Sequence, residues 1–309
     1  MRRPPFQTSF IKPVTRKNLK GGIVSSDEDR PRKKNAVLAF LAGKRRYSKE
    51  DRWQLWLRTL IITIISLTAF VLVWWGISIY LDLSYVPPPD SVYRAFIDSF
   101  RTPDPITGRV MWDNIVASLQ RVVLGFILAF VVAVPLGLFM GFSRTAENFT
   151  RPIVEVFRPI PPIAWVPITA IALGAVLGPV VVVFIGVFFP VLSNVIFGVK
   201  SIDPILPDAA RTLGAHRRDT FSKVIFPYTI PYIMTGIRIG LGIGWMCIVA
   251  AEMIIAIGGG VGQYIIFKGQ TSQYDYMFAG MIVIAILGLL TTELSGVIER
   301  RVSKWMGLK

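Results

Sequence analysis

The sequence predicts an all-α polytopic protein that crosses a membrane about six times. Of its 309 residues 53% are apolar, and the mean hydropathy is +0.55, a value that a soluble domain of this length rarely reaches. Several apolar stretches with few charges are long enough to span a bilayer, which takes about 20 helical residues. A segment in hydrocarbon must satisfy its own backbone hydrogen bonds, so we expect these stretches to be helices.

The first segment, residues 1–58, is polar and strongly basic. It holds sixteen Lys and Arg against five Asp and Glu, and therefore carries +11 of the net charge of +15. No short signal peptide with a small-residue cleavage site precedes the first apolar stretch, and we expect no processing. Residues 1–35 have the composition of a disordered tail. Residues 36–58 alternate apolar and basic residues, which fits either an amphipathic helix on anionic lipid or a basic flank that fixes topology.

The transmembrane domain, residues 59–309, contains the six predicted spans. Between the first two, Asp90 or Ser91 can cap a short helix that carries Val92, Phe96 and Phe100 on one side. A glycine-rich turn at 258–262 follows the fifth span and leads into a short amphipathic stretch. The spans cover about residues 59–81, 114–140, 160–174, 178–199, 228–257 and 277–297.

Prolines mark the start of the third span, at Pro161, Pro162 and Pro167. Proline removes backbone donors from a helix, and the carbonyls that this leaves free must find partners within the membrane. We therefore expect this segment to face protein or a water-filled cavity. The alternative is a simple kink at the membrane edge.

The charges at the two ends of the spans predict their direction. Lys and Arg are concentrated in four segments, 1–58, 141–158, 200–223 and 300–309. Six spans place these four segments on one side, and most of the remaining Asp residues on the other. Because cytoplasmic segments carry the excess of Lys and Arg, we expect both termini in the cytoplasm.

The residue counts exclude several kinds of site. Cys247 is the one cysteine and His216 the one histidine, so a disulfide within the chain and a His/Cys metal cluster are excluded. The P-loop pattern is absent, because Gly43-Lys44 is followed by Arg45. We therefore expect no metal site, no catalytic residue and no ATP hydrolysis by this chain. The basic composition could suggest nucleic acid, but cytosolic anchoring beside a membrane explains it better.

The loop before the fifth span has the features of a rigid docking helix. It contains Asp208-Ala209-Ala210-Arg211-Thr212-Leu213-Gly214 and, later, Val224-Ile225-Phe226-Pro227. Pro207 suits a first helical position, and the helix dipole favours the anion Asp208 there. The two alanines allow close approach, and Gly214 permits a sharp turn. A partner's groove could hold such a helix, which transmits force where a floppy loop does not.

This loop resembles the EAA loop of ABC importer permeases, with an acidic residue, two alanines, three residues, glycine, nine residues and Ile-x-Leu-Pro. The spacing agrees, while Asp208, Val224 and Phe226 replace Glu, Ile and Leu. From about Tyr85 onward the chain is similar to the permease family for nitrate, bicarbonate, sulfonates and taurine. The supporting segments are Val86-Pro87-Pro88-Pro89, Ser118-Leu119-Gln120-Arg121-Val122, Gly125-Phe126, Pro135-Leu136-Gly137, the run from Arg158 to Pro167, Phe188-Phe189-Pro190, Thr235-Gly236-Ile237-Arg238-Ile239-Gly240 and Ala250-Ala251-Glu252.

The resemblance implies the type I importer fold and the permease subunit of an ATP-driven importer of a small oxyanion, in the cell's inner membrane. It implies a permease homodimer, two cytosolic ATPase subunits that bind ATP and Mg, and an external substrate-binding protein, with no cofactor in this chain. The coupling loop, residues 200–227, is then expected to dock on the ATPase. The residues assigned to coupling are Asp208, Ala209, Ala210, Arg211, Gly214 and Pro227.

The fifth span carries two stripes. Gly236, Gly240 and Gly244 recur every four residues, a pattern that lets helices approach closely, although such glycines can also merely soften a helix. The second stripe comprises Arg238, Gly242, Trp245, Val249 and Glu252.

Charged residues inside spans usually face a cavity or a partner. One hypothesis is that Arg121 and Arg238 favour the passage of anions along a pathway that also includes Trp245 and Glu252. The alternative is structural: Arg121 pairs with Glu252 as a bridge, and Arg238 caps carbonyls of a broken helix.

Two other functions compete with an ABC permease. A secondary transporter often has two related halves with paired broken helices, and residues 59–160 and 161–309 show no clear repeat. A membrane-bound enzyme needs a nucleophile–base pair or a metal cluster, and the sequence suggests neither. For the substrate, related permeases also serve pyrimidine precursors and flavins, so nitrate, bicarbonate, taurine and these nutrients stay open.

Overall fold

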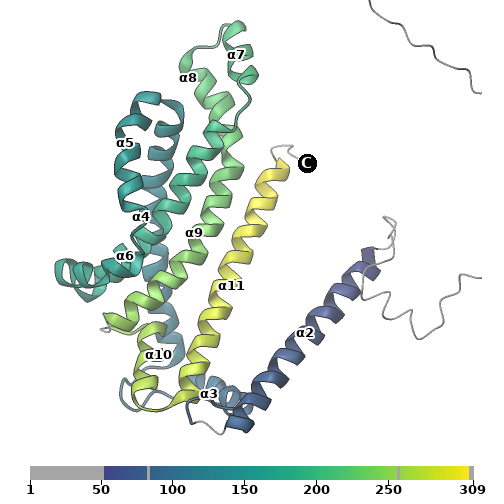
Figure 1. Ribbon diagram of the computed structural model, residues 1–309, viewed down its shortest axis with the longest axis vertical. Helices are drawn as coiled ribbons and strands as arrows, with labels where there is room; N and C mark the ends of the chain where they lie inside the picture. The colour runs from purple at the N-terminus through teal and green to yellow at the C-terminus, as the bar shows by residue number, and fades with distance from the viewer. Residues whose placement is uncertain (1–51, 82–83, 256–257, 306–309) are drawn as a thin grey trace, which may run out of the picture. The chain divides into compact units, whose positions relative to one another are not determined.

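The computed structural model describes residues 52–81, 84–255 and 258–305, and within these ranges the regular elements are helices (Figure 1). The expected tail 1–35 and residues 36–51 of the expected amphipathic helix lie outside the described residues. From Arg52 the chain is helical and continues into the first predicted span. The helices are α2 (Arg52–Leu81), α3 (Pro89–Arg101), α4 (Met111–Phe142), α5 (Arg144–Phe157), α6 (Val166–Lys200), α7 (Ile205–Thr212), α8 (Arg217–Thr220), α9 (Phe226–Ile254), α10 (Val261–Gln270) and α11 (Tyr274–Trp305).

Five helical stretches of the described chain are long and apolar enough to cross a membrane, where the sequence suggested about six. The difference lies in the third and fourth predicted spans, which fall in one stretch interrupted at Gly174, where φ is 73° and ψ is −175°. A glycine accepts this conformation, which is not helical, so the stretch consists of two helical segments, 166–173 and 175–200, that meet at a kink between the third and fourth predicted spans. The five stretches are Trp56–Leu81, Met111–Phe142, Pro162–Lys200, Arg217–Ile254 and Tyr274–Lys304.

The segment 141–158, expected to be a cytosolic loop, is instead largely the helix α5, which runs back alongside α4 (Figure 1). Its first turn is capped by Ser143, whose Oγ accepts the Ala146 N–H at 3.3 Å. Phe149, Ile153 and Val156 repeat at helical spacing and are exposed. Charged residues between these positions lower the average hydropathy, which is why the sequence suggested a loop.

The core consists of α4, α6 and α9, with α6 in contact with both of the other helices. The α6 side chains there are largely β-branched and fully buried, among them Val183, Val187 and Val191. Glycines of α4 and α9 accept them: a Cβ on Gly125 would lie 2.7 Å from Val183 Cβ. This close backbone approach is how helices associate tightly within a membrane, where the hydrophobic effect does not drive them together.

The proline-rich segment before α6 forms a 3-10 turn, Pro162–Trp165, in which the Ala164 N–H reaches the Pro161 carbonyl at 2.9 Å. Pro161 and Pro167 are exposed on the surface of this chain. Among the described residues, these two prolines therefore do not make the contact with protein that was one of the expectations for this segment.

A second apolar cluster packs α10 against α3 and the start of α4. Met111, Val261 and Ile265 are buried in it, with Phe96 and Phe100 beside them. The expected cap of α3 by Asp90 or Ser91 does not form. Pro88 is the N-cap, because Pro89 at the first helical position needs no donor, and Ser91 Oγ donates to the Pro88 carbonyl. In Figure 1, α3 and α10 lie at one end of the helices and α7 and α8 at the other.

Candidate functional site

The helix α7 projects from the end of the structure, and none of its residues is buried. It begins at Ile205, two residues before the expected start at Pro207, and the Asp203 carboxylate accepts the Ile205 N–H at 2.9 Å. Asp208 and Arg211 are both exposed and lie 3.2 Å apart. Leu213, directly after the helix, is 89% exposed. The helix thus presents charged and apolar side chains that contacts within this chain leave free.

The C-terminus of α7 is closed by a tight turn at Gly214, whose φ is +84°. Its N–H donates to the Arg211 carbonyl at 2.9 Å, and the Ala215 N–H donates to the Ala210 carbonyl at 3.0 Å. This is the paired hydrogen-bond pattern of a glycine-terminated helix. The turn fixes the end of α7.

Pro227 does not end the loop as expected but lies within a continuous helical stretch, Arg217–Ile254. Its missing donor is tolerated because it stands in the first turn of α9, directly after a π turn at Phe221–Ile225. The loop that carries α7 therefore ends before Pro227, and the end of α7 connects to α9 through only a few non-helical residues.

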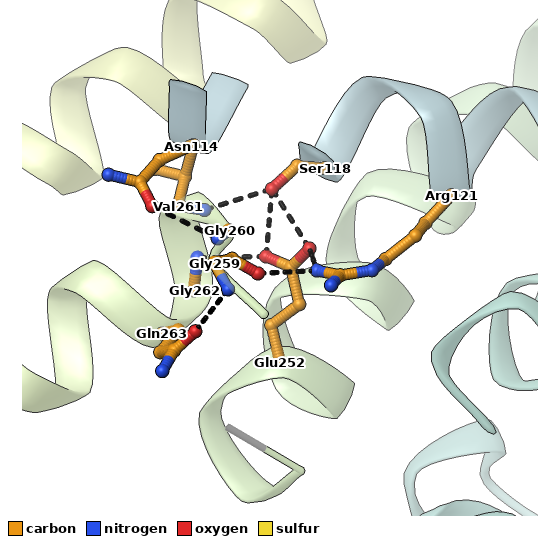
Figure 2. A network of polar contacts seen from close by, with 9 residues as sticks. All are labelled: Asn114, Ser118, Arg121, Glu252, Gly259, Gly260, Val261, Gly262 and Gln263. Atoms are coloured by element: carbon orange, nitrogen blue, oxygen red, sulfur yellow. Dashed lines mark hydrogen bonds and ion pairs between the residues drawn. The ribbon is translucent and has the colours of Figure 1, made fainter. Parts of the chain in front are cut away.

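At the other end of the structure, α4, α9 and the glycine-rich turn meet in a buried polar network (Figure 2). Glu252 is 2% exposed, and its carboxylate accepts Arg121 Nη1 at 2.7 Å, the Gly262 N–H at 3.0 Å and the Ser118 hydroxyl at 2.8 Å. Arg121 also donates to the Gly259 carbonyl at 2.6 Å. The two charges neutralise each other, and each finds further hydrogen bonds, as buried ions require.

The turn wraps closely around this carboxylate. Gly258, Gly259 and Gly260 have φ of 94°, 84° and 137°, and a Cβ on Gly260 would overlap the Glu252 carboxylate. The Gly260 N–H donates to Asn114 Oδ1 at 3.1 Å. Glycine is thus needed both for the backbone conformation and for the close approach.

The four residues of the pathway hypothesis form two separate sets of contacts. Arg121 and Glu252 form the ion pair that was the structural alternative. Arg238 lies 3.3 Å from Glu299 of α11, a partner that neither hypothesis named. Trp245 is 3% exposed and donates to Thr291 Oγ1 of α11 at 2.9 Å. Arg238 and Trp245 therefore connect α9 with α11, whereas Glu252 connects α9 with α4.

The three glycines of α9 face α6. A Cβ on Gly236 would lie 3.1 Å from Asn194 Cβ, and one on Gly240 would lie 3.0 Å from Val187 Cγ1. Gly244 approaches the same valine, at 3.2 Å from its Cγ2. The stripe thus lies where α9 and α6 come closest.

A buried ion pair that the sequence did not suggest joins α10 to the loop before α4. Lys268 contacts Asp104 and donates to Gln273 Oε1 at 2.6 Å, and the Asp104 and Lys268 side chains are 4% and 5% exposed. Burial alone would raise the pKa of Asp104, but hydrogen bonds from Lys268 and from the N–H groups of Thr107 and Ile106 outweigh it and hold that pKa below its usual value. A lone Lys in an amphipathic stretch and a lone Asp in a loop gave no signal of this contact.

Glu299, Thr291 and Ser118 were also not singled out as functional residues. Glu299 stands beside the basic C-terminal segment, where a solvated charge is expected, and single Ser and Thr residues in spans are common. In the part of the chain that the structure describes, no three His, Cys, Asp or Glu residues gather as metal ligands.

Comparison with known proteins gives a consistent result. The family model described as "Binding-protein-dependent transport system inner membrane component" matches residues 133–304, more than half of the chain. A putative ABC transporter permease protein of Methanocaldococcus jannaschii is 40% identical over 78% of this chain and 91% of its own length. The taurine transport system permease protein of Escherichia coli is 32% identical over 87% and 99%.

Two further similarities concern the substrate and the fold. A nitrate import permease protein of Leptolyngbya laminosa is 36% identical over 63% of this chain and 70% of its own length. Among solved structures, the permease fold recurs in the MetNI methionine ABC transporter, in an inward-facing conformation. The matched chain there has a TM-score of 0.54 and 22% identity, and the match covers 62% of this chain and 97% of that one.

Proposed function

The chain belongs to the family of inner membrane components of binding-protein-dependent transport systems and is an ABC importer permease, and we propose that it imports a small oxyanion, driven by a separate ATPase through α7. The observation that carries the coupling role is the geometry of α7. It is an exposed helix with no buried residue, fixed at both ends, by Asp203 and by Gly214, and joined to α9 almost directly. A displacement of α7 by a bound partner would therefore be transmitted to α9.

The partners follow from the same family. We infer a dimer of two permease copies, two cytosolic ATPase subunits and an external substrate-binding protein. ATP and Mg bind to the ATPase subunits and not to this chain. We place α7 and both termini in the cytoplasm of a cell with the permease in its inner membrane, because Lys and Arg gather in those segments. In this proposal α5, which runs back alongside α4 before α6 begins, supplies the return crossing that the five long apolar stretches lack.

The substrate class is inferred from the relatives. Those compared include permeases named for taurine, nitrate and aliphatic sulfonates, and each of these substrates carries a compact anionic group. We therefore propose a small oxyanion: nitrate, bicarbonate or a sulfonate such as taurine. A pyrimidine or flavin nutrient handled by the same machinery is the alternative.

For the pathway, we propose that Arg238 and Trp245 contribute to the passage of the anion, while Arg121 and Glu252 hold the outer end together. Trp245 lines an apolar groove of about 620 Å³ between α9 and α11, together with Gly242 and Gly288. Arg238, on the same helix, is the more exposed partner of its ion pair with Glu299. Normal uptake by an Arg238→Ala permease would remove Arg238 from the pathway.

The test is to co-express the permease with its ATPase and binding protein, reconstitute the complex in vesicles, and measure ATP-dependent uptake of labelled nitrate, bicarbonate and taurine. An Asp208→Lys/Gly214→Pro variant disrupts α7. Asp90→Lys makes the same charge change at an exposed position of α3 and serves as the control. We expect the α7 variant to lose at least about tenfold in uptake, since it removes a docking helix whose contacts must supply well over 1.4 kcal/mol.

The unfolding temperature of the α7 variant should stay close to that of the wild type, because α7 buries no residue of its own. If the variant bound the ATPase and supported uptake normally, the coupling role would be wrong. ATPase activity without uptake of any of the three anions would keep the mechanism and move the substrate to pyrimidines or flavins.

A further inference from the structure

A small pocket that contains charged side chains lies beside the glycine-rich turn, at the end of the structure opposite α7. Its volume is about 190 Å³, the space of roughly six water molecules. It is bounded by the loop before α4, the first turn of α4 and one face of α10. The lining residues that matter for the argument are Asp104, Thr107, Arg109, Asn114, Gly259 and Tyr264.

Arg109 provides the charge of this pocket. Its guanidinium lies against Gly259, where a Cβ would overlap Nη1. In the described part of the chain this guanidinium has no hydrogen bond and no carboxylate within ion-pair distance. Arg side chains at enclosed sites usually meet an anion, because five donors are otherwise left to water alone.

The neighbouring charges do not neutralise Arg109. Asp104 lines the same pocket, but its carboxylate is already engaged by Lys268 and by the N–H groups of Ile106 and Thr107. Arg121, close to Gly258, is neutralised by Glu252. The pocket therefore retains one net positive charge.

Tyr264 adds a second, independent feature. It is 7% exposed and lines this pocket, and in the described part of the chain its buried hydroxyl makes no well-formed hydrogen bond, although the Ser99 side chain lies near it. Burial raises the pKa of Tyr264, so the phenol stays protonated and can donate. Leaving a buried hydroxyl without a hydrogen bond costs free energy unless a bound ligand supplies the missing acceptor.

We propose that this pocket is an outer anion subsite, in which Arg109 and Tyr264 bind the sulfonate, nitrate or bicarbonate group of the substrate after it leaves the binding protein. The proposal rests on the proposed function, which makes the transported molecule an oxyanion and this end of the permease the outer one. The small volume suits a compact group, and the planar guanidinium fork matches two oxygens of such an anion.

The direct test measures binding of labelled taurine and nitrate to the permease–ATPase complex in lipid nanodiscs, without the binding protein. Arg109→Gln removes the charge of the pocket. Arg101→Gln removes the same charge from exposed α3, outside the pocket, and is the matched control. We expect Arg109→Gln to weaken anion binding at least about tenfold, and Arg101→Gln to leave it unchanged.

A Tyr264→Phe variant distinguishes a loss of anion binding from a loss of folding. It removes only a hydroxyl that makes no well-formed hydrogen bond with the described residues, so the unfolding temperature should not fall, while anion binding weakens a few-fold. Uptake by the full complex should show the same order of effects, with the anion concentration for half-maximal uptake raised most in Arg109→Gln.

Three outcomes overturn the subsite. In the first, Arg109→Gln and Arg101→Gln bind the anion alike. In the second, the wild-type complex takes up an oxyanion but binds none without the binding protein. In the third, Arg109→Gln weakens only the association with the binding protein, which would mean that the guanidinium pairs with a carboxylate of that partner. Absence of oxyanion uptake by the wild-type complex would instead remove the proposed function itself.

Discussion

Glu252 shows what a single charged residue does in this fold. Its carboxylate is buried and accepts bonds from Arg121, Ser118 and Gly262, so that one side chain connects α4, α9 and the turn before α10. A buried pair of this kind often contributes little compared with an apolar replacement, but breaking it leaves an unpaired charge.

We predict that Glu252→Ala lowers the free energy of unfolding by about 3–5 kcal/mol, because Arg121 stays buried without its carboxylate. The double variant Arg121→Met/Glu252→Met should recover part of this loss. Thermal unfolding of the purified permease in detergent measures both effects. Glu155→Ala, which breaks an exposed pair with Arg151, is the control and should cost no more than about 1 kcal/mol. If the losses at residues 121 and 252 were simply additive, the two side chains would not be coupled.

The lowered pKa of Asp104 predicts that the stability of the folded protein depends on pH. Because its pKa is lower in the folded protein than in the unfolded chain, its ion pair with Lys268 stabilises fully above the ordinary Asp pKa of about 3.9 and is lost as the pH falls through the lower, folded-state pKa. At pH 7 we expect Asp104→Asn to lower the unfolding temperature, since Lys268 remains buried without a carboxylate.

The difference in unfolding temperature between the wild type and Asp104→Asn should be constant from pH 7 to about pH 5 and should shrink below about pH 4. Unfolding temperatures at pH 7, 5.5 and 3.5 measure it. A difference that grew on acidification would show that the folded-state pKa is raised rather than lowered.

Among the elements, the contact of α9 with α6 depends on glycine. The period of four residues at 236, 240 and 244 predicted a close-packing face, and that face meets the valines of α6. Gly242, between these positions, has no atom within 4 Å of its potential Cβ. The two kinds of glycine on one helix allow a matched comparison.

We predict that Gly240→Leu destabilises the permease by about 1–3 kcal/mol, because the added side chain must push Val187 and Val191 away. Gly242→Leu should destabilise the permease far less, because no atom of the described chain lies within 4 Å of the added Cβ. Both variants gain the same helix propensity, so the difference in their unfolding temperatures isolates packing. Equal losses at 240 and 242 would contradict a packing role for the stripe.

Other elements could not be predicted from periodicity alone. The π turn before Pro227 keeps a helix continuous through a residue that usually ends one, whereas the non-helical backbone of Gly174 divides α6 into two segments at a kink. The helix α5 was hidden because its charged face lowers its hydropathy. In each case the conformation depends on how the segment packs against its surroundings. The average hydropathy of a stretch of sequence carries no information about that packing.

For the whole molecule, the distribution of charge predicts which way the protein lies in the membrane. In Figure 1 the described end of α11 points toward the end that carries α7, while α3 and α10 lie at the other end. This arrangement agrees with an excess of Lys and Arg at the α7 end.

We predict that cysteines at positions 48, 208 and 303, placed singly in a Cys247→Ala background, are labelled by a membrane-impermeant thiol reagent only in inverted membrane vesicles. A cysteine at Thr107 should be labelled in intact cells or in spheroplasts. Labelling of position 208 from outside would reverse the orientation and remove the basis for both the coupling role of α7 and the outer subsite.

The sequence by itself determined the class of protein, the short helix around Asp208 and the family. Each depends on a pattern local in the chain: apolar stretches long enough for a bilayer, basic segments between them, and the spacing from Asp208 to Pro227. The tertiary structure alone decided the pairing of Lys268 with Asp104 and of Arg238 with Glu299, and the pocket around Arg109. These contacts join residues far apart in the chain. Which charge meets which partner depends on how the helices pack, because burial makes an unpaired charge costly only once the surrounding structure has formed.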